Sequence, residues 1–84
     1  MAELIQTYAE VLRDARGDEF VASAHGEERA DGTWEGWIEF RPAAGVGDVR
    51  RTGRETTQPD RGALRYWASG LEPVYLQGAF ARAS

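Results

Sequence analysis

The chain has 84 residues, of which 42% are hydrophobic and 29% are charged, and it contains three Trp, three Tyr, three Phe and no Cys. The length predicts a single domain over residues 1–84, and the aromatic content argues against a disordered tail. The absence of Cys excludes disulfides and thiolate metal sites, and the formal net charge of −4 disfavours a general polyanion binder.

The start of the chain and its hydropathy predict a cytoplasmic protein. Residues 1–4 lack the basic segment and apolar run of a signal peptide. No uncharged apolar stretch approaches the roughly 20 residues that span a bilayer, so we expect no membrane association.

Residues 3–15 fit two patterns. Their apolar side chains recur at helical spacing, and residues 8–13 also alternate as in a strand. The strand is favoured, because no Ser, Thr, Asp or Asn caps a helix at Met1–Ala2 and a sheet without this strand would be marginal.

A first hairpin follows from that choice. A loop at residues 15–17, with Gly17 in the left-handed conformation, joins the first strand to a second over residues 19–25. This loop predicts three cross-strand pairs, which are Leu12 with Phe20, Arg13 with Glu19 and Tyr8 with Ala24.

Residues 33–40 alternate apolar and polar side chains and are predicted to form the central strand. A three-residue turn with left-handed Gly32 sets Ala24 opposite Ile38, which builds one apolar face, whereas a two-residue turn would set charged residues there. The same parity places Ala22 opposite Phe40 and, on the outer face, His25 opposite Trp37.

A fourth strand with a weak apolar signal is predicted over residues 48–54. If Phe40 pairs with Val49, the outer face carries a ladder of opposite charges. Its pairs are Glu39 with Arg50, Trp37 with Thr52 and Glu35 with Arg54.

The last third of the chain predicts helices. Thr57 is expected to be an N-cap, with Pro59 in the first turn and Asp60 three residues on, and the helix then ends at Gly70. Residues 73–83 fit a second helix or a final strand, and a helix is favoured by an apolar stripe at helical spacing. The predicted fold is therefore α+β, an antiparallel meander of three or four strands with one or two C-terminal helices packed on one face.

Three segments carry a resemblance to known proteins. WEGWIEF (34–40), RETTQP (54–59) and YWASGLEP (66–73) resemble a family of small bacterial proteins without an assigned activity. The order of a meander followed by a helix is similar to the layout of HicB-type antitoxins, which implies a protein partner.

No residue pattern predicts catalysis, a metal site or a cofactor. His25 is the single histidine and lacks the partners of a metal site. Glu35 and Glu39 share a strand face, but a water-exposed face beside arginines does not raise a carboxylate pKa, and no nucleophile, phosphate or nucleotide motif is present. We therefore expect a protein that is not an enzyme.

Two groups of residues are candidates for binding. Trp37 beside His25 on a polar face predicts an anchor for a protein partner or a second copy in a homodimer, unless the C-terminal segment with Tyr75 and Phe80 covers it. The first prediction is therefore a non-catalytic protein-protein interaction module. The alternative is a nucleic-acid or anionic-ligand binder that uses an arginine-rich face, formed by Arg50, Arg54, Arg61 and Arg65.

Overall fold

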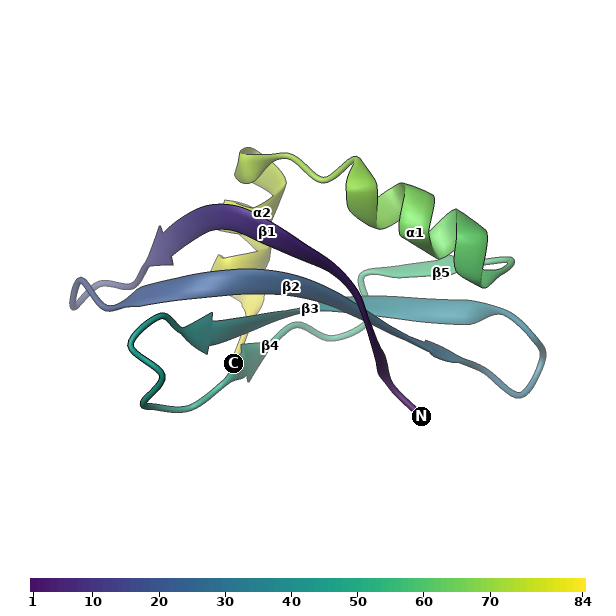
Figure 1. The fold of residues 1–84 in the computed structure, drawn as a ribbon, viewed down its shortest axis with the longest axis horizontal. Coiled ribbons are helices and arrows are strands. Elements are labelled where there is room, and N and C mark those ends of the chain that lie inside the picture. The colour runs from purple at the N-terminus through teal and green to yellow at the C-terminus, as the bar shows by residue number, and fades with distance from the viewer.

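The computed structural model describes residues 1–84 as an antiparallel sheet followed by two helices (Figure 1). The strands follow each other in the sheet in the order β1-β2-β3-β4, and β5 pairs with the other end of β3. The predicted α+β meander with one or two C-terminal helices on one face is confirmed, and two helices are present. The elements are β1 (Glu3–Arg13), β2 (Glu19–Glu28), β3 (Trp34–Pro42), β4 (Arg50–Arg51), β5 (Thr56–Gln58), α1 (Arg61–Ser69) and α2 (Pro73–Arg82).

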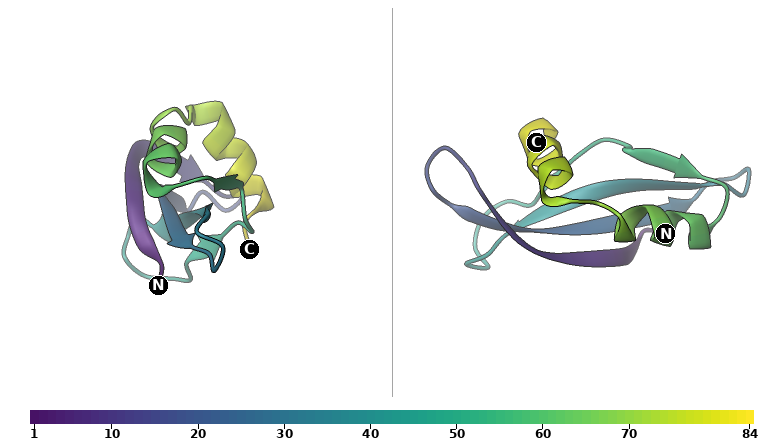
Figure 2. Two further views of the ribbon diagram at one scale, coloured as in Figure 1. Left: turned by 90° about the vertical axis from the view of Figure 1, so that its right-hand side faces the viewer. Right: turned by 90° about the horizontal axis from the view of Figure 1, so that it is seen from above.

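Both helices lie on the same side of the twisted sheet, which curls around them (Figure 2). The core forms between this side of the strands and the inner faces of the helices, because the apolar residues of β2 and β3 alternate onto it. Neither helix is long and apolar enough to cross a membrane. The main cluster of buried core residues consists of Leu12, Phe20, Ala22, Ala24, Ile38, Phe40, Ala68, Leu76 and Ala79. Leu64 of α1 is also fully buried.

The pairing of β2 with β3 has the predicted register. Ala24 lies opposite Ile38, and His25 lies opposite Trp37. The turn is closed by a hydrogen bond from the backbone N–H of Arg29 to the carbonyl of Thr33, 2.7 Å long, and Gly32 has the expected left-handed φ of 87°.

The prediction that the first segment is a strand is confirmed, but its register is only partly correct. Next to the loop, where Gly17 has a φ of 85°, Leu12 pairs with Phe20 as expected. Further along, β1 is interrupted by register shifts, so Ala24 lies opposite Gln6 and not opposite Tyr8. The bulges insert extra residues on the β1 side, which a pattern read on β1 alone cannot reveal.

The predicted register of the fourth strand is wrong by one residue. Phe40 pairs with Arg50, and Glu39 pairs with Arg51. Such a slip exchanges the two faces, so Arg50 turns toward the helices and the predicted charge ladder does not form. After Thr52 the chain bulges away at Gly53 and Arg54 and returns to β3 as β5, which the sequence did not predict.

The first helix begins later than predicted. Thr57 lies in β5, and the N-cap is Asp60, whose Oδ1 accepts a 2.8 Å hydrogen bond from the backbone N–H of Ala63. The second helix is confirmed, with Leu76 and Ala79 buried in the core. Beyond it, Ser84 exchanges two 3.2 Å backbone hydrogen bonds with Arg51, which tie the end of the chain to β4.

Two opposed glycines let α1 approach the sheet. Gly26 and Gly36 pair directly across β2 and β3, and the side chain of Leu64 from α1 sits over both. A Cβ at Gly36 would lie 2.7 Å from Cδ1 of Leu64, which is closer than real Cβ atoms approach a neighbour. Glycine at these two positions therefore sets the distance between helix and sheet.

We expect Gly36→Ala to lower the free energy of unfolding by about 1–3 kcal/mol, because the added methyl group overpacks the contact with Leu64. The measurement is urea denaturation followed by circular dichroism. Gly62→Ala is the matched control, since Gly62 is an exposed position of α1 where alanine favours the helix by about 1 kcal/mol. A Gly36→Ala protein as stable as the wild type would contradict this packing.

Candidate functional site

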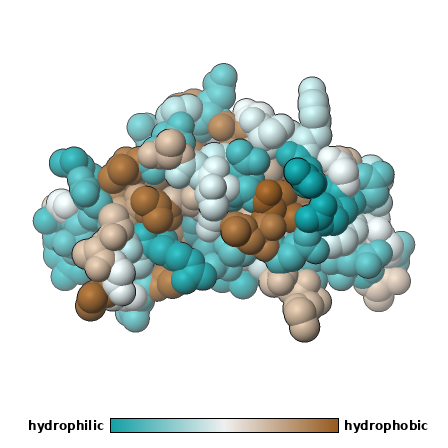
Figure 3. Space-filling model, in the orientation of Figure 1, coloured by the Kyte–Doolittle hydropathy of each residue, from teal (hydrophilic) through white to brown (hydrophobic).

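No helix lies over the second face of the sheet, which we call the open face. Its side chains follow from the strand register, because directly opposed residues point to the same side. Figure 3 shows hydrophobic side chains in separate groups on the molecular surface, with hydrophilic ones between them. On β1 to β3 the open face is formed by Leu4, Thr7, Val11, Val21, Ser23, His25, Glu27, Glu35, Trp37, Glu39 and Arg41.

Trp37 is at the centre of the open face but is buried, with 3% of its surface exposed. The guanidinium carbon of Arg51 lies 4.4 Å from the ring centroid, and the His25 ring stacks beside it at 6.4 Å. The indole Nε1 donates a 3.0 Å hydrogen bond to Glu39 Oε2. The expectation of an exposed Trp37 anchor is therefore wrong, because neighbouring strands cover the ring.

The alternative prediction, that the C-terminal segment covers Trp37, is also wrong. The Phe80 ring packs 5.0 Å from that of Phe40, and Tyr75 packs edge-on against Trp67, so both lie on the helix side of the sheet. The tail acts on Trp37 only indirectly, through the backbone bonds of Ser84 to Arg51.

His25 and Ser23 lie together with Glu39 on the open face. Ser23 Oγ is 2.9 Å from His25 Nε2, and Glu39 Oε1 is 3.6 Å from the same nitrogen. A histidine that activates a serine uses one ring nitrogen for the hydroxyl and the other for the carboxylate. Here both groups approach Nε2, so the cluster does not have the geometry of a nucleophile. Ser23 had not been singled out from the sequence, although its pairing with Glu39 follows from the predicted register.

Burial makes protonation of His25 unfavourable. Desolvation is the main cause that lowers the pKa of His25; the Glu39 carboxylate opposes this effect, and the guanidinium groups of Arg41 and Arg51 add to it. The ring is therefore neutral at pH 7 and can both donate and accept a hydrogen bond.

We expect the free energy of unfolding to decrease as the pH falls below about 6.5. The unfolded chain takes up a proton at the ordinary histidine pKa of about 6.5, whereas folded His25 binds it only at lower pH, so stability is complete above that value. Denaturant titrations between about pH 5 and 8 measure this dependence. Because His25 is the single histidine, His25→Gln should flatten the curve, and Arg65→Gln, far from the ring, should not. The same slope in the His25→Gln protein would contradict the assignment.

A cavity of about 410 Å³ opens on the open face at the larger irregularity of β1. Thr7 pairs with Ser23 and Val11 pairs with Val21, so three residues of β1 face one residue of β2 between these pairs. We call the space beside this irregularity the bulge cavity. Its lining consists of Leu4, Thr7, Tyr8, Val21, Ala22, Ser23, His25 and Arg41.

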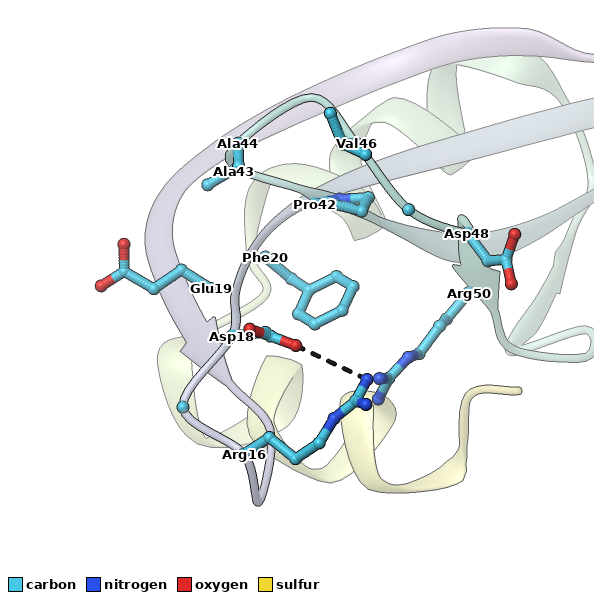
Figure 4. Close-up of a pocket in the computed structure, with 12 residues that line it drawn as sticks. Arg16, Asp18, Glu19, Phe20, Pro42, Ala43, Ala44, Val46, Asp48 and Arg50 are labelled. Atoms are coloured by element: carbon cyan, nitrogen blue, oxygen red, sulfur yellow. Dashed lines mark ion pairs between the residues drawn. The ribbon is translucent and has the colours of Figure 1, made fainter.

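A second cavity, of about 480 Å³, lies between the β1–β2 loop and the β3–β4 loop (Figure 4). Phe20 forms its inner wall, and the side chains of Arg16 and Arg50 extend toward each other across it. Arg16 pairs with Asp18 at 3.5 Å, and Arg50 pairs with Asp14 at 3.0 Å. Both cations are therefore neutralised by the protein itself.

The interaction of Arg50 with Asp14 closes this end of the sheet. Desolvation acts to raise the pKa of Asp14, but hydrogen bonds from the backbone N–H groups of Asp18 and Arg16 and from Arg50 outweigh it and hold the pKa below its usual value. The Arg50 guanidinium carbon also lies 4.5 Å from the Phe20 ring centroid and 5.4 Å from that of Phe80. Arg50 is thus part of the packing between the strands and α2.

The four predicted arginines do not form one surface. Arg50 pairs with Asp14, just after the end of β1, and Arg61 pairs with Glu3 at its start. A strand of this length spans roughly 30 Å, so the two arginines lie at opposite ends of the molecule. Arg54 and Arg65 are exposed and form no ion pair.

The fold and the site define a small α+β protein with helices on one face of the sheet and a cavity on the other. No group of three His, Asp or Glu side chains is arranged to hold a metal ion. No protein-family model, curated protein or solved structure matches the chain.

Proposed function

We propose that the protein is a non-catalytic protein-protein interaction module that binds a protein partner, or a second copy of itself, through the open face. The observation that carries the proposal is a group of exposed apolar side chains on a sheet face without a helix. Leu4 is 54% exposed, Val11 51% and Val21 38%, and Leu4 and Val21 also line the bulge cavity. Exposed apolar residues gathered around a depression are typical of binding surfaces.

Trp37 has a supporting place in this proposal. Its ring is held by Arg51, His25 and Glu39, so it stabilises the centre of the face and cannot insert into a partner without breaking those contacts. The contact surface accordingly shifts from β3 toward β1 and β2, where apolar side chains are accessible.

The alternative, a nucleic-acid or anionic-ligand binder, is supported by Arg54 and Arg65, which are exposed without an acidic partner. It has weaker support than protein binding, because Arg50 is paired and packed and Arg61 is paired with Glu3. A polyanion contact made by two separated arginines would supply little of the counterion release that drives such binding.

The test is a double substitution, Leu4→Asp with Val11→Asp, which places two charges on the open face without entering the core. The partner is first isolated from the native cell by affinity purification, and binding of the purified pair is then titrated; sedimentation measures self-association. We expect affinity to fall by about tenfold or more, since each substitution removes an apolar contact and adds a desolvation cost.

Val74→Asp is the matched control. Val74 is 71% exposed at the start of α2, on the helix side of the molecule, so the same chemical change there should leave binding intact. Circular dichroism verifies that each variant is folded. Equal affinity of the double variant and the wild type, or a loss caused by Val74→Asp alone, would contradict the proposed face.

A further inference from the structure

The lining of the bulge cavity combines exposed aliphatic side chains with more deeply placed polar ones. Leu4 and Val21 provide apolar surface, and Thr7, Ser23 and His25 provide hydroxyl and imidazole groups, whereas the side chain of Ala22 points into the core on the other side of the sheet. The volume of about 410 Å³ lies within the range of roughly 300–1,000 Å³ that is usual for small-molecule sites. β-Bulges are also frequent next to functional sites, because they redirect side chains and end regular pairing.

The lining carries one formal charge. Arg41 is the single Arg, Asp or Glu among the lining residues, and 58% of its side chain is exposed. Arg41 forms an ion pair with Glu39, in which Nη2 lies 3.5 Å from Oε1, and its other guanidinium N–H groups remain available to a further acceptor. His25 adds no charge at pH 7, since burial keeps the ring neutral.

Glu39 is the nearest acid behind the lining residues, and its carboxylate is already occupied. Oε2 accepts the hydrogen bond from the Trp37 indole, and Oε1 faces both His25 and Arg41. The side chain is 15% exposed and does not line the cavity. The cavity therefore presents two aliphatic side chains beside a guanidinium with unused donors, and its complement is an apolar body that carries one carboxylate.

We propose that the bulge cavity is a binding site for a small monocarboxylate with an apolar body. The apolar body packs on Leu4 and Val21, and the carboxylate accepts hydrogen bonds from the Arg41 guanidinium, since arginine can bind carboxylates in a bidentate geometry. This site goes beyond the proposed protein interaction and does not depend on it. Because the cavity is open on one side and the ligand is small, we expect dissociation constants near the millimolar range.

The experiment is a titration of the ¹⁵N-labelled protein with hexanoate, followed by amide chemical shifts. We expect the changes to concentrate at Thr7, Val21, Ser23, His25 and Arg41. Hexanamide has the same apolar body without the negative charge, and hexylamine carries a positive charge on a similar alkyl chain. Both should bind at least about tenfold more weakly than hexanoate, since the charge-assisted hydrogen bond to Arg41 is lost.

Two variants separate the contributions of charge and shape. Arg41→Gln should weaken hexanoate binding about tenfold, and Val21→Trp should block it by filling the cavity, whereas Arg65→Gln is the matched control and should leave it unchanged. Loss of the chemical-shift response in the Val21→Trp protein supports the proposal only if its circular dichroism spectrum shows the wild-type fold. Arg41→Gln tests the site independently of that variant.

Three results would overturn the proposal. They are no shift change up to about 10 mM hexanoate, equal binding of hexanamide, or unchanged affinity in the Arg41→Gln protein. This test can fail or succeed independently of the test of the protein interaction, because the partner titration and its Val74→Asp control do not involve hexanoate. Hexanoate binding in a protein that has no partner would leave this site standing and reject only the interaction module.

Discussion

The pairing of β2 with β3 is the constraint on which the other features depend. It places Ala22 opposite Phe40 and Ala24 opposite Ile38 on the helix side, and Gly26 opposite Gly36 where Leu64 packs. The alternate positions of the same strands place His25 next to Trp37 on the open face. Because a slip of one residue would exchange the two faces, the core and the open face are determined together by this single register.

The centre of the open face is stabilised by polar groups although its largest side chain is aromatic. Trp37 has Arg51 over its ring, His25 beside it and the Glu39 carboxylate at its indole N–H. Arg51 is itself held by backbone hydrogen bonds to Ser84. The sheet thus covers the apolar surface of the indole and provides a hydrogen-bond acceptor for its N–H group. Accessible apolar area remains only toward β1, where the proposed interactions lie.

The irregularity of β1 has two physical effects. A long edge strand offers unpaired backbone groups to other chains, and bulges make such pairing harder because they disturb the regular spacing. The same bulges interrupt the pairing of β1 with β2 beside the cavity that Leu4, Val21 and Arg41 help to line. Tyr8 helps to hold the distorted strand, since its hydroxyl donates a 2.7 Å hydrogen bond to the Ala68 carbonyl in α1, and desolvation raises its pKa to about 12.

The sequence by itself determined the parts of the fold that depend on local patterns: the alternating strands β2 and β3, the left-handed Gly17 and Gly32, and the apolar stripes of the helices. Only the tertiary structure decided the bulges of β1, the division of the last pairing into β4 and β5, the Asp60 cap and the cover of Trp37 by Arg51. Residues 48–58 contain few apolar side chains, so neither register nor face is specified by burial in that segment. Long-range contacts with β3 determine the register and the face of this segment.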